Sequence, residues 1–230
     1  MKYLLAALAH LLLASGASAH FAFILPADDG RCVDVVFSEQ LEPDMKVSID
    51  KIAATTLFEV DAAGRVAPLE WAKHEHSLTS STLGRKTLAV GGLADYGFAQ
   101  SKHTGNKPVD VRYYPKAILG DPAAATAPLF GSQVPLEIVP VVIEGRLAFR
   151  ALLKGLPLAD ADCAVLVAGE GKPARAKTNA EGLLPVAIEK PGLVGARVKF
   201  VEIKGGEANG KKYDEIHHFA TLTVTAGGKK

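Results

Sequence analysis

The sequence predicts an all-β protein of two β-sandwich domains that follow a cleavable leader. Short apolar or alternating segments recur along the chain, and turns containing glycine or proline separate them, as in sandwiches. Outside the leader, no segment has the apolar period and the caps of an amphipathic helix. The composition indicates a folded product, because 48% of the 230 residues are hydrophobic and 22 glycines and 13 prolines supply turns.

The leader is residues 1–19, MKYLLAALAHLLLASGASA, which have the form of a signal peptide. Lys2 gives the positive charge, residues 3–13 form the apolar run, and Ala17-Ser18-Ala19 is a small-x-small cleavage site. The segment is too short and wrongly flanked for a transmembrane helix, and no cysteine lies at the cleavage site to carry a lipid. We therefore expect a soluble periplasmic or secreted protein, without membrane insertion, that begins at His20.

Residues 20–130 form the expected N-terminal sandwich. Residues 109–114 alternate apolar and polar side chains, which is the period of a half-buried strand, and residues 61–65 form a hairpin-type turn. Residues 43–54 stay open between a strand, because apolar residues alternate there, and a short helix that Pro43 would begin. The strands expected in this half are 33–37, 57–60, 66–69, 87–90 and 109–114.

Residues 131–230 form the expected C-terminal sandwich, after a small-residue, proline-flanked linker at 120–128. The expected strands are 136–143, 146–153, 163–168, 184–188, 196–203 and 219–224. The pieces KGLPLADADCAVLV, TNAEGLLPV and EKPGLVGARV resemble the carboxypeptidase-regulatory, transthyretin-like sandwich over about residues 145–203. That resemblance implies a fold and no chemistry.

Charge and cysteine content exclude some classes of function. The 26 Lys and Arg balance 25 Asp and Glu, so nothing favours binding to nucleic acid or to an anionic membrane. Cys32 and Cys163 lie far apart in apolar runs, which favours two free buried thiols over one disulfide. No Cys-x-x-Cys spacing exists, so redox or structural zinc chemistry of that kind is not indicated.

No catalytic motif is present. The sequence lacks Gly-x-Ser-x-Gly, a phosphate-binding loop, Gly-x-Gly-x-x-Gly and His-Glu-x-x-His, and its carboxylates form no obvious catalytic pair. We therefore expect a protein that is not an enzyme and has no catalytic residues, and histidine becomes the informative residue type.

His20 would be the first residue of the mature chain. Its free α-amine and its imidazole would then belong to one residue and could close a chelate ring on a metal ion, which an internal histidine cannot do. The alternative is that His20 is an arbitrary first residue, as in many exported proteins.

The other mature histidines have weaker patterns. His74 and His76 would share a face if they lay on a strand, a geometry that suits a metal, but their polar surroundings also fit a solvated loop. His103 lies in a loop-like SKHTGNKP segment, where a solvated role is the alternative. His217 and His218 precede an alternating strand, and His218 begins its apolar side, where histidines are commonly hydrogen-bonded core groups.

Several pieces together resemble a bacterial family of exported proteins with a domain of unknown function, identified as a periplasmic component of nickel or cobalt uptake. The pieces are AHFAFILP at 19–26, ADYGFAQSKHTGNKP at 94–108, VRYYPKA at 111–117, PLEIVP at 135–140 and KKYDEIHHFATLTV at 211–224. The resemblance implies two β-sandwich domains, metal binding by His20 and His218, and a membrane metal-uptake transporter as partner. His217 stands where similar chains commonly have arginine, so it is either an added ligand or a neutral substitution.

The leading hypothesis is therefore an exported protein that binds nickel, cobalt or copper and assists uptake of the ion. His20 and His218 are the first candidate ligands, and His217, His103, His74 and His76 are the others. Nitrogen ligands suit all three metals, and the usual affinity order favours copper. One alternative is a non-enzymatic sandwich module that binds protein or glycan. Another is a copper-dependent oxidase, because the first residue resembles the histidine brace of copper monooxygenases.

Overall fold

The computed structural model describes residues 20–27, 29–100, 105–131, 133–186, 188, 191–208 and 210–227. This part of the chain is all-β, as the sequence predicts, and no helix in it is long and apolar enough to cross a membrane. The short 3₁₀ helices are η1 (Ile49–Ile52) and η3 (Pro122–Ala125). The strands are β1 (Phe21–Pro26), β2 (Val33–Ser38), β3 (Thr55–Asp61), β4 (Val66–Leu69), β5 (Trp71–Lys73), β6 (Ser77–Ser80), β7 (Thr87–Gln100), β8 (Pro108–Ile118), β9 (Leu136–Ile143), β10 (Arg146–Leu153), β11 (Leu156–Pro157), β12 (Asp162–Val167), β13 (Ala174–Lys177), β14 (Gly192–Ala208) and β15 (Lys211–Ala226).

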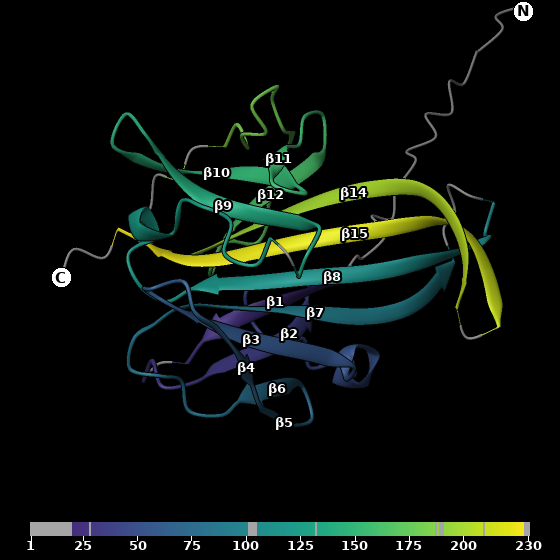
Figure 1. The fold of residues 1–230 in the computed structure, drawn as a ribbon, viewed down its shortest axis with the longest axis horizontal. Coiled ribbons are helices and arrows are strands. Elements are labelled where there is room, and N and C mark those ends of the chain that lie inside the picture. Colours follow the sequence, from purple (N-terminus) through teal and green to yellow (C-terminus); the bar gives the residue numbers. More distant parts are fainter. Residues whose placement is uncertain are drawn as a thin grey trace, which may run out of the picture.

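One eight-stranded sheet forms the centre of the molecule, in the order β13-β12-β14-β15-β8-β7-β3-β4 (Figure 1). Its strands come from both halves of the chain, and β15 pairs with β8 in parallel where the halves meet. The segments 20–130 and 131–230, which the sequence suggests as two domains, therefore share one continuous sheet.

Two smaller sheets cover opposite faces of this central sheet. On β15, Ala220 and Leu222 pack in the core beneath the β11-β10-β9 sheet, and this side is here called the β9 face. Thr221 and Thr223, which alternate with these residues along β15, point to the other side and contact β1 of the β1-β2-β6-β5 sheet. This side is called the β1 face. Because successive side chains of a strand point to opposite faces, the two sides of the central sheet contribute to two separate hydrophobic cores.

A ladder of hydroxyl groups holds the free edge of β1 to the central sheet. β1 pairs with β2 on one side and is the edge strand of its sheet. On its other side, Thr221 donates to the carbonyl of Ala22 at 2.7 Å, and Thr223 donates to the carbonyl of Ile24. Tyr113 donates to the carbonyl of His20 at 3.2 Å. Every second carbonyl of this edge therefore has a partner, as buried backbone groups require. We call these three contacts the hydroxyl ladder.

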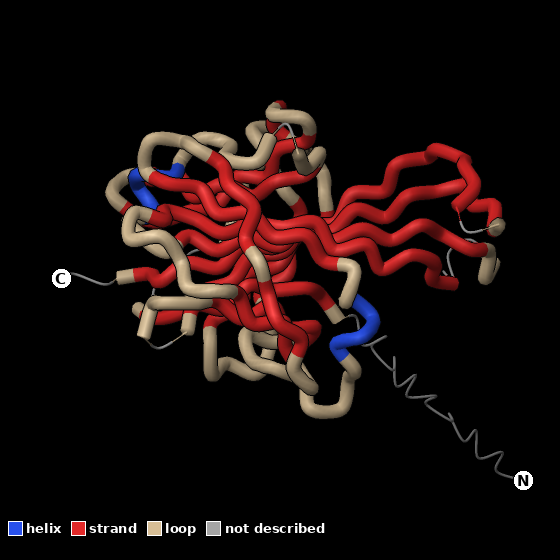
Figure 2. The backbone as a smooth tube through the Cα atoms, turned by 60° about the horizontal axis from the view of Figure 1, so that its bottom comes forward, coloured by secondary structure: helices blue, strands red, loops and turns tan. Residues whose placement is uncertain are grey.

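Four strands continue past the body of the protein as an arm. β12 pairs with β14 as far as Lys199, and β3 pairs with β7 as far as Ala94. Beyond these points, β7, β8, β15 and β14 run on together, and Figure 2 shows them projecting to the right. Both free edges of the arm carry register shifts, at Asp95/Gly97 and at Ile203/Gly206. Such bulges protect exposed edges from pairing with other strands.

Several sequence expectations about single elements are met and others are wrong. β4, β9 and β10 have the bounds predicted for them, whereas β7, β14 and β15 are longer because they continue into the arm. Residues 43–54 contain the 3₁₀ helix η1 instead of a strand. Within 184–188, the described residues form no strand, because Pro185 has no N–H to donate and the chain makes one isolated bridge at Leu183.

The cysteines are both free thiols in this structure. Cys163 is buried in the core of the β9 face, and Cys32 is half-buried just before β2. Burial raises the pKa of both thiols, so they act as small apolar side chains and not as reactive groups.

Candidate functional site

His20 lies directly before β1, and its side chain contacts a carboxylate from a distant loop. Its Nε2 is 2.8 Å from Oδ2 of Asp44, and its side chain is 18% exposed. Asp44 is held in turn by the backbone N–H of Lys46, which donates to Oδ1 at 2.9 Å. The hydrogen bond from His20 is the main reason that the pKa of Asp44 is below its ordinary value. The imidazole therefore has a fixed orientation at the start of the described chain.

This contact decides which nitrogen of the ring remains for a ligand. An ionised carboxylate can only accept, so Nε2 of His20 carries the hydrogen and Nδ1 carries the lone pair. Nδ1 is the nitrogen that can close a six-membered chelate ring with the α-amine of the same residue. A carboxylate on the far nitrogen is also the usual outer partner of a metal-bound histidine, where it fixes the tautomer and raises basicity.

Aromatic rings surround the position of His20. The ring of Phe37 lies 5.6 Å from the imidazole and 5.5 Å from the ring of Tyr113. Tyr96 packs 6.0 Å from Tyr113, and Phe219 stacks on Tyr113 at 5.3 Å. These rings come from β2, β7, β8 and β15, so side chains from four strands of two sheets surround the residue directly before β1.

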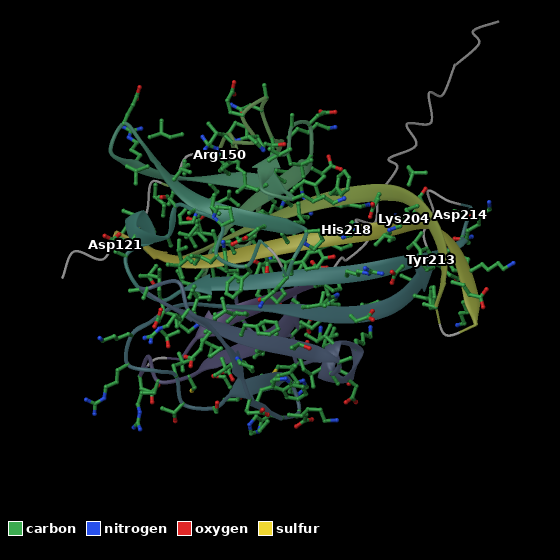
Figure 3. The ribbon with its side chains drawn as sticks, viewed as in Figure 1. Asp121, Arg150, Lys204, Tyr213, Asp214 and His218 are labelled. Atoms are coloured by element: carbon green, nitrogen blue, oxygen red, sulfur yellow. The ribbon has the colours of Figure 1, made fainter. Side chains whose placement is uncertain are left out.

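His218 is a buried core group on the opposite face of the central sheet. Its ring stacks between Tyr114 at 5.8 Å and Phe200 at 5.9 Å, and the residue is 3% exposed. Tyr114 donates to its Nδ1 at 2.8 Å, and its Nε2 lies 3.2 Å from Glu202. Burial is the main reason that the pKa of His218 is lowered, so the ring is neutral. Figure 3 shows His218 on β15 near the base of the arm.

The structure therefore does not bring His20 and His218 together, contrary to the expectation of a shared site. The cause is alternation along β15: Phe219 and Thr221 face β1, so His218, which alternates with them as Ala220 does, points to the β9 face. A metal at His218 would also have to displace both existing partners of its ring.

His217 lies on the β1 face, the side on which His20 is found. Its ring is 6.4 Å from that of Phe219, and its Nε2 is 3.0 Å from Oε2 of Glu215. The side chain is 8% exposed. Of the two neighbouring histidines on β15, it is thus the one that faces the β1 sheet.

The remaining candidates lie elsewhere. His74 and His76 occupy the turn between β5 and β6 instead of one face of a strand, and β5 is at the opposite edge of its sheet from β1. His74 is exposed. Nδ1 of His76 is buried and has no hydrogen-bond partner among the described residues. His103 lies outside the described residues.

Sequence reasoning missed Asp44, the residue that orients His20. It is 24 positions along the chain from His20 and part of no motif, so only the fold reveals the contact.

Among the described residues, no three side chains of His, Cys, Asp or Glu are gathered as a metal-binding group. A scan of protein-family models gives no match to the chain, and a search of curated proteins gives none either.

Proposed function

We propose that the mature protein is an exported binder of a divalent transition-metal ion, held at its N-terminus, and that it assists uptake of nickel, cobalt or copper. The observation that carries the proposal is the 2.8 Å contact between Nε2 of His20 and Asp44. It leaves Nδ1 for the metal, beside the α-amine that cleavage after Ala19 would release.

The chemistry of the two donors suits such a role. An α-amine has an ordinary pKa of about 8 and an imidazole one of about 6.5, so a metal ion displaces their protons easily at neutral pH. Both are nitrogen ligands, which nickel, cobalt and copper favour. Two donors from one residue leave open positions on the ion, so it can be passed on as cargo.

The proposal includes the cellular setting. The leader 1–19 would direct the chain to the periplasm or outside the cell, and a membrane metal-uptake transporter would receive the ion. The segments 20–130 and 131–230 would be two sandwich units built on the shared central sheet. The ladder of Tyr113, Thr221 and Thr223 would keep the metal-binding end of β1 at a constant position on these units.

The test is calorimetric titration of protein that begins at His20 with nickel chloride and copper sulfate. A matched protein with one alanine before His20 keeps the imidazole and loses the free amine. We expect this extension to weaken binding by about 100-fold or more, because the chelate is lost. Asp44→Asn should weaken binding by about 10-fold to 100-fold, as outer-partner changes do. Equal affinity of the extended and unextended proteins would refute the proposal.

A second candidate is a non-enzymatic binding module, and the arm favours it. The arm exposes Ile203 at 79% and displays the Phe98 and Tyr213 rings, 6.0 Å apart, beside Lys211. Figure 3 shows Lys204, Tyr213 and Asp214 on the arm, farther from the body than His218. A protein that fails to bind any of the metals but retains a partner through the arm would favour this function.

A further inference from the structure

We propose that Arg197 and Arg175 bind a small oxyanion with two negative charges, either a phosphate or a dicarboxylate, on the β1 face of the central sheet. This inference does not depend on metal binding by His20 and goes beyond the proposed function. It starts from the register of β13, β12 and β14 at the outer edge of the sheet.

The register places the two arginines in one row. Ala164 on β12 pairs with Arg175 on β13 and with Arg197 on β14, so these residues lie side by side across three strands. Arg197 also pairs with Thr221, which contacts β1, so the row lies on the β1 face. The Cα atoms of the arginines are about 10 Å apart, since neighbouring strands lie about 5 Å apart. Between them, Ala164 has only a methyl group, so the two long side chains can meet above it.

Arg197 is a buried cation whose N–H donors lack an acceptor. It is 6% exposed, and its guanidinium carbon lies 4.1 Å from the centre of the Phe21 ring. A ring face attracts the cation but accepts none of the N–H groups in the guanidinium plane. Within the part of the chain that the structure describes, no hydrogen bond or ion pair joins this guanidinium to another side chain.

The charges near Arg197 favour an added anion. Burial, the larger cause, and the like charge of Arg175 lower the pKa of Arg197 to about 10, and Glu39 partly opposes them. A buried charge is costly unless an opposite charge pairs with it. An anion between the two arginines would offset both the burial of Arg197 and its repulsion by Arg175.

The next row of the same three strands adds positive charge. Asp162 on β12 pairs with Lys177 on β13 and with Lys199 on β14. Lys177 contacts Asp160 at 3.1 Å, and Lys199 lies 5.8 Å from the centre of the Phe219 ring. The two rows together therefore carry four basic side chains and one acidic one, which attracts an anion to this edge.

The residue type indicates the class of ligand. The planar guanidinium donates two parallel N–H bonds to a carboxylate or a phosphate, which an ammonium group cannot do. Two such groups in one row suit a ligand with two negative charges. Arg175 and Lys177 are exposed on the edge strand β13, so the ligand can enter from that side.

A titration followed by nuclear magnetic resonance tests the proposal. The probes are sodium phosphate and disodium succinate, and sodium chloride at equal ionic strength is the reference. The backbone amide signals of Ala164 and Arg197 should shift and saturate with at least one oxyanion and should not do so with chloride. The probe that binds more tightly shows whether the site is made for phosphate or for a dicarboxylate.

Variants connect the signal to the two arginines. Arg197→Lys keeps the charge and loses the planar donor group, so affinity should fall about 10-fold or more, as for a lost hydrogen bond to a charged group. Arg175→Gln, at an exposed position, should weaken binding to a similar extent. Arg146→Gln, at an exposed arginine of β10, is the matched control and should keep the wild-type affinity.

The exposed position keeps the test decisive, because Arg175→Gln removes no buried group. If Arg197→Lys fails to fold, as its amide spectrum would show, Arg175→Gln decides alone. The proposal is overturned if neither oxyanion gives a saturating shift, or if Arg175→Gln binds as tightly as the wild type. Metal binding is measured separately with nickel and copper, so failure of one site does not affect the other.

Discussion

Tyr113 on β8 donates its hydroxyl to the carbonyl of His20, 3.2 Å away, and so joins the central sheet to the residue directly before β1. Tyr113 is 6% exposed, and burial raises the pKa of its hydroxyl far above the ordinary value, so the group remains a donor at every physiological pH. A buried phenol thus holds the backbone that leads into β1.

Tyr113→Phe should therefore loosen the start of β1 without changing the core. We expect a loss of about 1 kcal/mol in the free energy of unfolding, the usual net value of one hydrogen bond. Metal affinity should fall as well, because the amine and imidazole of His20 are less well oriented. Urea denaturation and calorimetry measure the two effects. Tyr96→Phe is the control, since the hydroxyl ladder does not use Tyr96; equal losses in both variants would contradict the role of Tyr113.

The two threonines of the ladder give a prediction about stability alone. Thr221→Val and Thr223→Val keep the shape of each side chain and remove the donor to Ala22 or Ile24. A buried carbonyl then loses its partner, so each variant should lower the free energy of unfolding by about 1 to 3 kcal/mol. Thr225→Val, at an exposed position of the same strand, should have little effect. Urea denaturation of the three variants checks this, and equal losses at all three positions would be the contrary result.

The all-β class followed from the sequence because turn residues and alternation are local signals. The bounds of β4, β9 and β10 were predictable for the same reason. The shared central sheet was not, because the parallel pairing of β15 with β8 joins segments about a hundred residues apart, and no local pattern encodes it. Likewise β1 was missed as a strand. Its run FAFILP is apolar throughout and is buried from Phe21 to Ile24 in the core of the β1 face, so it lacks the alternation of a half-buried strand.

The candidate site was predictable in part. His20 follows from the cleavage pattern, but Asp44 comes from a loop that the sequence could not locate. The choice between His217 and His218 depended on which face of β15 meets β1. The sequence shows that the two residues point to opposite faces, but only the packing of β1 against Thr221 shows that His217 lies on the same side of the central sheet as β1.

A buried ion pair connects the two halves at the central sheet. Nζ of Lys116 is 2.7 Å from Oε1 of Glu137, and the two side chains are 3% and 5% exposed. Glu137 also accepts from the backbone N–H groups of Leu129 and Phe130, so it fixes the crossing between β8 and β9. Burial lowers the pKa of Lys116, which means that its charge depends on this partner.

Lys116→Met should therefore cost about 3 to 5 kcal/mol in the free energy of unfolding, since it leaves the carboxylate of Glu137 buried without a cation. The double variant Lys116→Met with Glu137→Gln removes both charges and retains an acceptor for the two backbone donors. It should recover a large part of the loss. A double-mutant cycle by urea denaturation measures the coupling, and additive losses would mean that the pair does not act as a unit.

Acid should weaken the fold through His218, whose pKa is lowered chiefly by burial. The unfolded chain takes up a proton at this residue below about pH 6.5, and the folded chain does not until a lower pH. The unfolded state thus binds more protons in that window, and the free energy of unfolding falls as the pH decreases, by at most about 1.4 kcal/mol per pH unit. Glu202 adds a second loss at lower pH, because its hydrogen bond to His218 lowers its pKa.

Urea denaturation between pH 8 and pH 5 tests this dependence. His218→Phe removes the titrating group and leaves Tyr114 without its acceptor, so the variant should be less stable at pH 8 by about 1 to 3 kcal/mol. Its stability should nevertheless change less between pH 7 and pH 5.5 than that of the wild type. His74→Ala, at an exposed histidine, should keep the wild-type slope. If His218→Phe keeps that slope too, the acid sensitivity comes from another group and His218 has no part in it.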